Sequence, residues 1–305
     1  MDKILFGSDP EGFYSTFNGL GGIKVVPPAV YRFDHKFPVV EKDPKHPVFR
    51  VADGENGVIK LIEDGAAFEL TVPPSENMKT LYQDIQIGYQ LASEVAREFG
   101  NFITITPAIP FDTNEFKNRK RLFNQCLIFG CDPDNDIYEM QGLIDERPME
   151  EKALDHPWRY GGGHIHISGI EFFQKKPLLA VKMLATFVGN LVTFRSPMKH
   201  EDHIRTYRYG RPGRFRIQDY GKKFNNMDWT NQGIEYRTPS NAWTTDTGLT
   251  DLIEMTIRTI AESVLPDDKL MQCLVDDLED RTVRAVMEGI PELAEQNYKD
   301  AMSMI

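Results

Sequence analysis

The chain has little cysteine. Its 305 residues contain three, Cys126, Cys131 and Cys273, and no two of them have C-x-x-C spacing. Three cysteines cannot all pair, which argues against a disulfide framework or a thiolate zinc site and fits a reducing cytosol. Residues 1–7 become polar too early for a secretory signal peptide. We therefore expect a cytoplasmic protein.

Positive charge and long apolar runs are also scarce. Lys and Arg number 35 against 46 Asp and Glu, a net charge of −11. A chain this acidic is a poor candidate for non-specific binding to duplex nucleic acid. The longest apolar run, Pro177 to Phe194, contains Lys182 and Asn190 and therefore predicts a buried helix instead of a membrane span. We expect neither duplex nucleic acid nor a membrane as a partner.

Several common catalytic and phosphate-binding motifs are missing. The sequence has no G-x-x-x-x-G-K-[ST] loop, no G-x-G-x-x-G after a strand and no G-x-S-x-G elbow. Any nucleotide would therefore bind through metal ions and arginines instead of a glycine-rich phosphate cradle. The absence of a nucleophile motif also argues against covalent catalysis by a serine or a cysteine.

The hydrophobic pattern predicts strands and helices in irregular alternation. Predicted strands are residues 4–6, 66–72, 102–107, 164–168 and 235–238, and predicted helices are 81–99, 177–194, 249–264 and two more acidic ones beyond. We expect hairpins and loops over 18–60, a loop with a short helix over 111–125, and a long loop over 205–232. The tight alternation favours an α+β fold with antiparallel pairing. We expect one domain, 1–305, in which 248–305 forms a helical C-terminal part.

Three short polar segments are the most informative feature. They are Asp9-Pro10-Glu11, His164-Ile165-His166 and Glu235-Tyr236-Arg237. Residues two apart on a strand share a face, so each segment places two ionisable groups on one surface. Carboxylates and imidazoles together indicate a divalent-metal site, and the arginine indicates an anion on the metal. Each segment alone could be structural: a solvated turn, a buried histidine pair or a surface ion pair.

Two further segments could complete such a site. Residues 64–69 supply Asp64 and Glu69, although Glu63 and Asp53 are other candidates for the additional ligand. Five arginines fall within twelve residues and are interleaved with glycine: Arg205, Arg208, Arg211, Arg214 and Arg216. Guanidinium groups on a loop indicate clamping of phosphate or carboxylate, and we expect two or three of them to reach a ligand. The alternative is a solvated charge run.

The order of these motifs resembles the glutamine synthetase and glutamate–cysteine ligase superfamily. Gly7-Ser8-Asp9-Pro10-Glu11 and Gly162-Gly163-His164-Ile165-His166-Ile167 are most similar to the G-x-D-P-E and G-G-H-I-H-I motifs of phage-type carboxylate–amine ligases, amidoligase type 2. The resemblance covers most of residues 5–240. It implies a glutamine synthetase-like catalytic fold, a curved antiparallel sheet with helices packed on one face. It also implies a phage protein acting in the host cytoplasm.

The resemblance implies a set of metal ligands and phosphate contacts. Metal ligands would be Asp9, Glu11, Asp64, Glu69, His164 and Glu235, with Glu11, Glu69 and Asp64 nearer the carboxylate substrate and Asp9, His164 and Glu235 on the ion that bridges the phosphates. ATP contacts would be His166, Arg205, Arg208, Arg211 and Arg237, and the transferred phosphoryl group would meet Arg237, Arg216 and Arg214. The cofactors implied are ATP and two or more ions of Mg²⁺ or Mn²⁺.

The implied reaction is ATP-dependent ligation of a carboxylate to an amine. Phosphorylation converts the unreactive carboxylate into an acyl phosphate, which the amine attacks, with release of ADP and phosphate. The substrates would be small: an amino acid, a peptide or a modified nucleotide. Alternatives are a guanidino-type phosphotransferase on the same fold, a metal-dependent amide hydrolase, and a non-enzymatic binding protein. The sequence leaves the substrates and the oligomeric state open.

Overall fold

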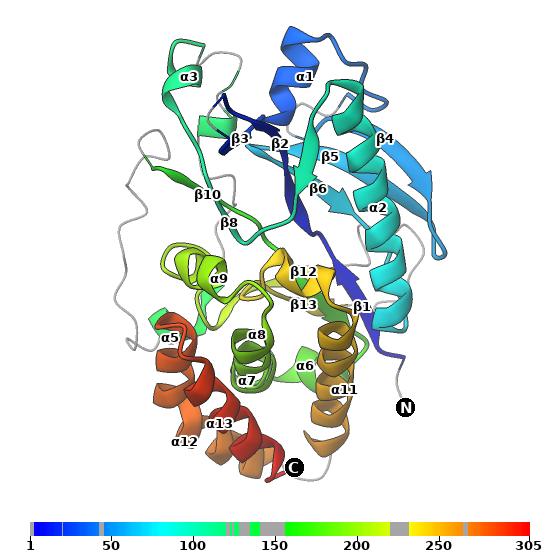
Figure 1. Ribbon diagram of the computed structural model, residues 1–305. Helices are drawn as coiled ribbons and strands as arrows, with labels where there is room; N and C mark the ends of the chain where they lie inside the picture. The colour runs from blue at the N-terminus through cyan, green and yellow to red at the C-terminus, as the bar shows by residue number, and fades with distance from the viewer. Residues whose placement is uncertain are drawn as a thin grey trace.

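Two antiparallel sheets and a layer of helices make up the computed structural model, which describes residues 3–19, 21–42, 46–119, 123, 125–127, 135–140, 156–219, 232–264 and 268–305. Every strand pairing among these residues is antiparallel. The α+β class with antiparallel sheets, predicted from the sequence, is confirmed. Figure 1 shows the chain passing from β1 (Leu5–Ser8) into β2 (Glu11–Phe17) and so from one sheet into the other.

The first sheet holds strands from distant parts of the chain. Its order is β1 (Leu5–Ser8), β11 (Ile165–Ser168), β13 (Gln232–Tyr236), β12 (Arg214–Asp219) and β9 (Asn135–Asp136). One face is apolar because Phe6, Ile165, Ile167, Ile234 and Tyr236 alternate with the polar residues between them and are buried. Helices α6 (Glu171–Lys175) and α7 (Pro177–Leu184) contact this sheet. The opposite face carries the polar residues.

The second sheet is formed by the N-terminal third of the chain. Its order is β3 (Ile23–Val25), β2 (Glu11–Phe17), β6 (Ala67–Thr71), β5 (Val58–Asp64) and β4 (Val48–Asp53), and β7 (Phe102–Thr104) also pairs with β2. The long helix α2 (Met78–Glu98) packs against it, beginning where the side chain of Asn77 accepts a hydrogen bond from the Thr80 N–H. A small ribbon of β8 (Ala108–Pro110) and β10 (Trp158–Tyr160) lies beside the sheets.

Residues 177–206 and 241–302 are mainly helical where the structure describes them, and the helices at 177–195 and beyond 247 agree with the sequence prediction. Residues 177–195 run through α7, the π-helical η2 (Ala185–Gly189) and α8 (Asn190–Arg195), followed by α9 (Lys199–Thr206). Then come η4 (Asn241–Thr245), α11 (Thr247–Val264), α12 (Asp268–Met287) and α13 (Pro291–Met302). Of these helices, α7, α8, α11, α12 and α13 pack together beneath the first sheet (Figure 1). One hydrophobic cluster runs from Phe6 and Phe68 through Ile165 to Met271 and Ala301.

One helical segment is apolar enough to be tested as a membrane span. Within the described residues, Pro177–Arg195 has the length and composition to cross a membrane, but 72% of its most apolar window is buried inside the fold. Core helices pass the same test, so this observation is weak evidence for a span. Its burial agrees with the core helix that the sequence predicts.

Two sequence predictions of local structure are wrong. Residues 28–34 form the helix α1 (Pro28–Asp34) within the stretch predicted as hairpins and loops, with Pro28 in the first helical turn. Residues 214–219 form β12 inside the predicted long loop, since Phe215 and Ile217 alternate with polar residues there. The short helices α3 (Asn114–Lys117), α5 (Ile137–Met140) and η1 (Gln125–Leu127) complete the described elements. Residues 220–231 of the predicted loop lie outside the described residues.

Candidate functional site

The three polar segments of the sequence meet on the polar face of the first sheet. Strand β11 lies between β1 and β13, and the register pairs Gly7 with His166, His166 with Glu235, and Glu235 with Arg216. These residues therefore form a row across neighbouring strands. Arg237 follows the last residue of β13, and its N–H donates to the Arg214 carbonyl at 2.9 Å. Antiparallel pairing thus brings together residues far apart in the sequence.

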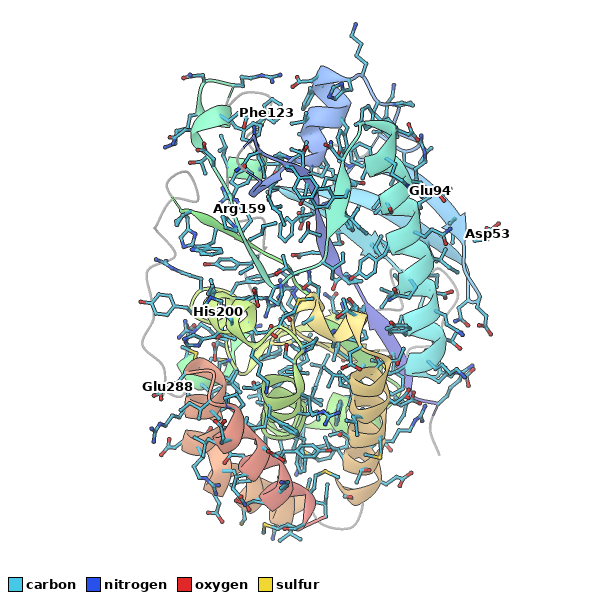
Figure 2. The ribbon with its side chains drawn as sticks, in the orientation of Figure 1. Asp53, Glu94, Phe123, Arg159, His200 and Glu288 are labelled. Carbon is cyan, nitrogen blue, oxygen red and sulfur yellow. The ribbon has the colours of Figure 1, made fainter. Side chains whose placement is uncertain are left out.

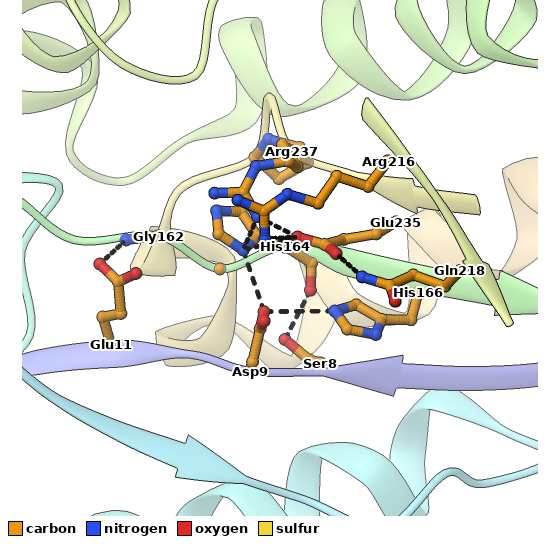
Figure 3. Close-up of polar contacts among 12 residues, drawn as sticks. Ser8, Asp9, Glu11, Gly162, His164, His166, Arg216, Gln218, Glu235 and Arg237 are labelled. Carbon is orange, nitrogen blue, oxygen red and sulfur yellow. Dashed lines mark hydrogen bonds and ion pairs between the residues drawn. The ribbon is translucent and has the colours of Figure 1, made fainter. Parts of the chain in front are cut away.

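The link between the two sheets places the N-terminal carboxylates. Pro10 has no N–H to donate, so the β1 ladder ends at Ser8 and a new one begins with β2 at Glu11. Figure 3 shows Asp9 and Glu11 rising from the same side of this stretch, but toward different partners. The side chains of Asp9 and Glu11 therefore point to the same side, as expected, although Asp9-Pro10-Glu11 is a junction between two strands and not part of one strand.

Asp9, His166 and Glu235 form the first candidate ligand group. They offer one ligand atom each, and these atoms lie within 4.8 Å of one another. The Nε2 of His166 is 3.3 Å from Oδ1 of Asp9. Two carboxylates and an imidazole are a donor set that Mn²⁺ or Mg²⁺ accepts. The resemblance assigns His164 to this ion, whereas the geometric group contains His166.

His164 lies behind this group and touches both of its carboxylates. Its Nδ1 is 3.0 Å from Oδ1 of Asp9 and 3.6 Å from Oε1 of Glu235, and the side chain is almost fully buried. Burial, and next to it the Arg237 charge, lowers the pKa of His164. A neutral imidazole in contact with both carboxylates can orient them as well as bind a metal.

Cationic and amide groups converge on Glu235, which is fully buried. Arg237 donates to its Oε1, Gln218 donates to its Oε2, and Nη1 of Arg216 lies 3.6 Å from Oε1 (Figure 3). Burial opposes ionisation of Glu235, but the attraction of His166, His164 and Arg237 prevails and lowers its pKa. An arginine pair beside a candidate metal group is a suitable place for an anion such as phosphate.

Glu11, Asp64 and Glu69 form the second candidate ligand group. Their ligand atoms also lie within 4.8 Å of one another. Glu11 and Glu69 are cross-strand partners in β2 and β6, and Asp64 ends β5 before the turn at Gly65, whose φ is +57°. The Gly162 N–H donates to Oε2 of Glu11 at 2.8 Å. Three carboxylates in one place indicate a hard divalent cation.

The second group is electrostatically unlike the first. Burial, followed by repulsion from Asp64, raises the pKa of Glu11 to about 8. Burial, followed by the charges of Asp9 and Asp64, raises the pKa of Glu69 well above its usual range. Burial likewise raises the pKa of Asp64. Within the part of the chain that the structure describes, neither Glu11 nor Glu69 forms an ion pair with a basic side chain, so a divalent cation would neutralise this group.

The pKa of Asp9 is shifted in the opposite direction. Burial raises its pKa, but the attraction of His164 and His166 and their hydrogen bonds outweigh burial, and its pKa lies well below the usual range. Its carboxylate still contributes to the raised pKa of Glu69 and of Asp64. The two ligand groups therefore share one electrostatic field.

The structure distinguishes the acidic residues that the sequence left open. Glu63 is buried but faces away from the ligand groups, because both of its oxygens accept hydrogen bonds from Arg32, at 2.9 and 2.8 Å. Asp53 ends β4 at the outer edge of the second sheet (Figure 2). Asp64 is the one of the three that joins Glu11 and Glu69.

The arginine-rich segment divides into supports and site residues. Arg205 is fully buried and donates to the carbonyls of Thr238, Arg237 and Pro239. Arg211 pairs with Glu139, and Arg214 pairs with Glu139 and with Asp136, at 3.2 Å for the latter. Arg208 lies half-buried in the turn after α9. Arg216 and Arg237 are the members of the predicted set that contact the Glu235 carboxylate.

The glycine run before β11 is held by the segment after β13. A Cβ on Gly163 would lie 2.3 Å from the Ser240 carbonyl oxygen, and a Cβ on Gly161 would lie 2.3 Å from Nδ2 of Asn241. Trp243 donates from Nε1 to the Gly163 carbonyl at 2.7 Å. The triple glycine therefore serves close backbone packing at the site.

Sequence reasoning missed three residues that shape the site. Gln218 follows Arg216 by two positions on β12, and its signal was the strand alternation hidden in the predicted loop. Asn241 donates to the Glu11 and Thr106 carbonyls, at 2.8 and 3.0 Å. Tyr209 contacts both His164 and Arg237. Only tertiary packing brings Asn241 and Tyr209 here, so no local pattern could have indicated them.

Comparison with known proteins adds no identification. The chain matches no family model, and no curated protein matches it.

Proposed function

We propose that the protein is an ATP-dependent carboxylate–amine ligase of glutamine synthetase-like fold. The observation that carries the proposal is the pair of ligand groups at the junction of the two sheets, with Arg237 and Arg216 on the side of the first group. Among the described residues, Glu11 and Glu69 of the second group form no ion pair with a basic side chain, whereas the first group is rich in arginine. This combination suits divalent cations together with a polyphosphate.

The donor sets fit divalent cations. Glu11, Asp64 and Glu69 would hold one ion, and Asp9, Glu235 and a histidine would hold another. When bound, such ions would supply neutralisation of phosphate charge and alignment of the reacting oxygens. The raised pKa values in the second group support this assignment, because buried carboxylates that lack a counter-ion favour a cation.

The protein's own residues would do the rest by positioning. Arg237 and Arg216 would stabilise charge on the transferred phosphoryl group, because guanidinium groups bind phosphate oxygens in a fixed geometry. His164 would orient Asp9 and Glu235. Transfer of the γ-phosphoryl group to the substrate carboxylate breaks the bond to ADP and forms an acyl phosphate. The amine then attacks the acyl carbon and releases phosphate, and no protein nucleophile is needed.

A guanidino-type phosphotransferase is expected to use a reactive cysteine near the guanidinium group, and the thiols that the structure describes do not support one. Burial raises the pKa of the Cys126 thiol to about 12, so it is not a reactive thiolate. Cys273 is exposed on α12, within the C-terminal helices. Cys131 lies outside the described residues. A phosphorylated guanidine product would nevertheless favour that reaction over ligation.

The hydrolase alternative requires more histidines near the metal than the described residues supply. Among these residues, neither ligand group includes His35, His46, His156, His200 or His203. His46 approaches Asp64 only to 3.9 Å and is half exposed. Cleavage of an amide without ATP would favour the hydrolase.

The test is ATP turnover with Mg²⁺ in the presence of pooled amino acids and pooled small amines. ADP release should require the amino-acid pool, which supplies carboxylates and amines alike, and Glu235→Gln should lower it by about 100-fold or more because Glu235 is central to the first group. Glu94→Gln is the matched control, since Glu94 is exposed on the outer side of α2 (Figure 2). ADP release that needs neither pool, or that survives in Glu235→Gln, would contradict the proposal.

A further inference from the structure

Tyr209 connects the turn after α9 to two buried groups of the site, His164 and Arg237. Its hydroxyl oxygen lies 3.1 Å from Nε2 of His164, and Arg237 donates to it from Nη2 at 3.0 Å. The ring of Tyr209 also meets the His164 imidazole edge-on, with centroids 6.0 Å apart. Tyr209 belongs to neither β11 nor β13, the strands that adjoin His164 and Arg237, so it links these two residues from outside the sheet.

The two contacts are chemically compatible and directional. A guanidinium can only donate, so the Tyr209 oxygen accepts from Arg237, and its own proton is available to Nε2 of His164. The opposite ends of the two partners face the carboxylates: Nη1 of Arg237 donates to Glu235, and Nδ1 of His164 lies 3.0 Å from Asp9. One hydroxyl therefore holds both side chains from behind while their other ends meet the ligand group.

The position of Tyr209 is itself well supported. The guanidinium of Arg205 lies over its ring, 4.8 Å from the centroid, and the Tyr209 N–H donates to the Arg205 carbonyl at 2.7 Å. Gly210 has a φ of +71°, and a Cβ there would lie 1.9 Å from Nη1 of Arg205. The Tyr160 ring stacks beside it at 6.4 Å. These contacts fix the ring, so the hydroxyl is presented at a defined point.

We propose that Tyr209 is a positioning residue of the phosphoryl-transfer site, whose hydroxyl holds Arg237 against Glu235 and His164 against Asp9. The kinetic consequence rests on the proposed ligase function, whereas the structural consequence does not. Arg237 has several rotatable bonds, and its charge is useful only in the orientation that faces the transferred phosphoryl group. Loss of the hydroxyl should therefore affect turnover more than nucleotide binding.

The kinetic test compares Tyr209→Phe with Tyr207→Phe. The first keeps the ring on Arg205 and removes only the hydroxyl, and the second removes the hydroxyl of a tyrosine in the same turn that is 55% exposed. Tyr209→Phe should lower kcat by about 10- to 100-fold and change the KM for ATP by less than about threefold. Tyr207→Phe should behave like the unmodified protein.

The structural test uses nitrogen-15 NMR of the histidine side chains of the intact protein, without ATP or metal. The His164 signals are assigned by their loss in His164→Gln. In Tyr209→Phe the Nε2 signal should move, since it loses its hydrogen-bond partner, and in Tyr207→Phe it should not. An unmoved signal overturns the inference whatever the kinetics show. If the signal moves but the unmodified protein shows no ATP turnover, the contact between Tyr209 and His164 is supported. That result would contradict the proposed ligase function and not the positioning role.

Discussion

Glu235 and Glu69 bear the same functional group in opposite surroundings. Glu235 receives hydrogen bonds from Arg237 and Gln218, and its pKa is lowered although it is fully buried. Glu69 faces Glu11 and Asp64, and its pKa is raised by burial and by the neighbouring carboxylates. At the residue scale, basic side chains of the protein neutralise the negative charge of the first group, whereas the negative charge of the second group would be neutralised by a bound cation.

Glu69→Gln should therefore stabilise the metal-free protein. In the unfolded chain a glutamate loses its proton at its usual pKa of 4.5, whereas in the folded protein the pKa of Glu69 is raised well above this and that of Glu11 is raised to about 8. As pH rises from 4.5 toward 8, the folded protein therefore binds more protons than the unfolded chain, and the stability of the fold decreases. Near pH 8 in the presence of a chelator, the substitution should add about 1–3 kcal/mol to the free energy of unfolding in urea. The lowered pKa values of Asp9 and Glu235 act below this window.

The same variant should lose part of the thermal stabilisation that Mg²⁺ gives the unmodified protein, because a ligand that binds only the native state raises its stability and the first ligand group would still bind an ion. Glu94→Gln, an exposed change of the same chemistry, should alter neither property. A Glu69→Gln protein that is destabilised, and that Mg²⁺ stabilises as strongly as it does the unmodified protein, would show that these carboxylates do not form a cation site.

Arg237→Lys should remove most of the activity without unfolding the protein. The guanidinium reaches Glu235 with Nη1 and Tyr209 with Nη2, and an ammonium group cannot span both. We expect kcat to fall by about 100-fold or more, measured by ADP release. Arg195→Lys is the matched control, since Arg195 is exposed at the end of α8. Equal decreases in kcat in the two variants would contradict a specific role of Arg237 in catalysis.

At the scale of elements, the site depends on how the segment after β13 packs on the glycine run before β11. The Ser240 carbonyl and the Asn241 backbone occupy the space beside Gly163, and buried Arg205 holds three carbonyls of the same segment. Both contacts are made to main-chain atoms, which cannot move independently of their elements. The backbone around Arg237 is therefore fixed from two sides.

Gly163→Ala should destabilise the fold strongly. Its Cβ would lie 2.3 Å from the Ser240 oxygen and 2.8 Å from the Asn241 Cα, so the two segments would have to separate. We expect a loss of about 2–4 kcal/mol in urea denaturation. Gly19→Ala is the control, because nothing lies within 4 Å of its Cβ position. Similar stability in the two variants would contradict the packing described.

Arg205→Met tests the same contact from the other side. Removal of the buried guanidinium takes a donor from three carbonyls, although that of Pro239 still accepts from the Gly163 N–H, and the expected loss of stability is about 3–5 kcal/mol. Arg195→Met should leave urea denaturation nearly unchanged. A stable Arg205→Met protein with weakened ATP binding would instead favour the direct nucleotide contact that the resemblance implies for Arg205.

The sequence predicted the elements whose pattern is local and missed those whose position depends on packing. The i, i+2 alternation of His164 and His166, and the helical period of residues 81–99, suffice to place β11 and α2. Strand β12 was missed because it follows a glycine- and arginine-rich turn that resembles a loop. The choice of Asp64 over Glu63 as the candidate ligand depends on the ion pair between Glu63 and Arg32. Arg32 lies in another element, so the spacing of residues 63 and 64 could not predict this choice.

The whole molecule places the site where its two sheets meet. The chain leaves β1 at Asp9, enters β2 at Glu11, and so contributes one carboxylate to each ligand group within three residues. A single hydrophobic cluster extends from the second sheet through β11 to the C-terminal helices, so both groups are supported by one core. The two groups are therefore held in a fixed relation to each other, as two ions acting on one polyphosphate would require.

The central claim is that a substrate carboxylate is activated by phosphorylation at this site. The most direct measurement uses a pool of amino acids labelled with oxygen-18 in their carboxylates, incubated with ATP, Mg²⁺ and small amines, followed by mass spectrometry of the phosphate released. An acyl-phosphate intermediate transfers one carboxylate oxygen to phosphorus, so the account predicts one labelled oxygen in each phosphate formed along with an amide, and none with Glu235→Gln. Amide formation that releases unlabelled phosphate, or ATP cleavage with unlabelled phosphate and no amide, would contradict it.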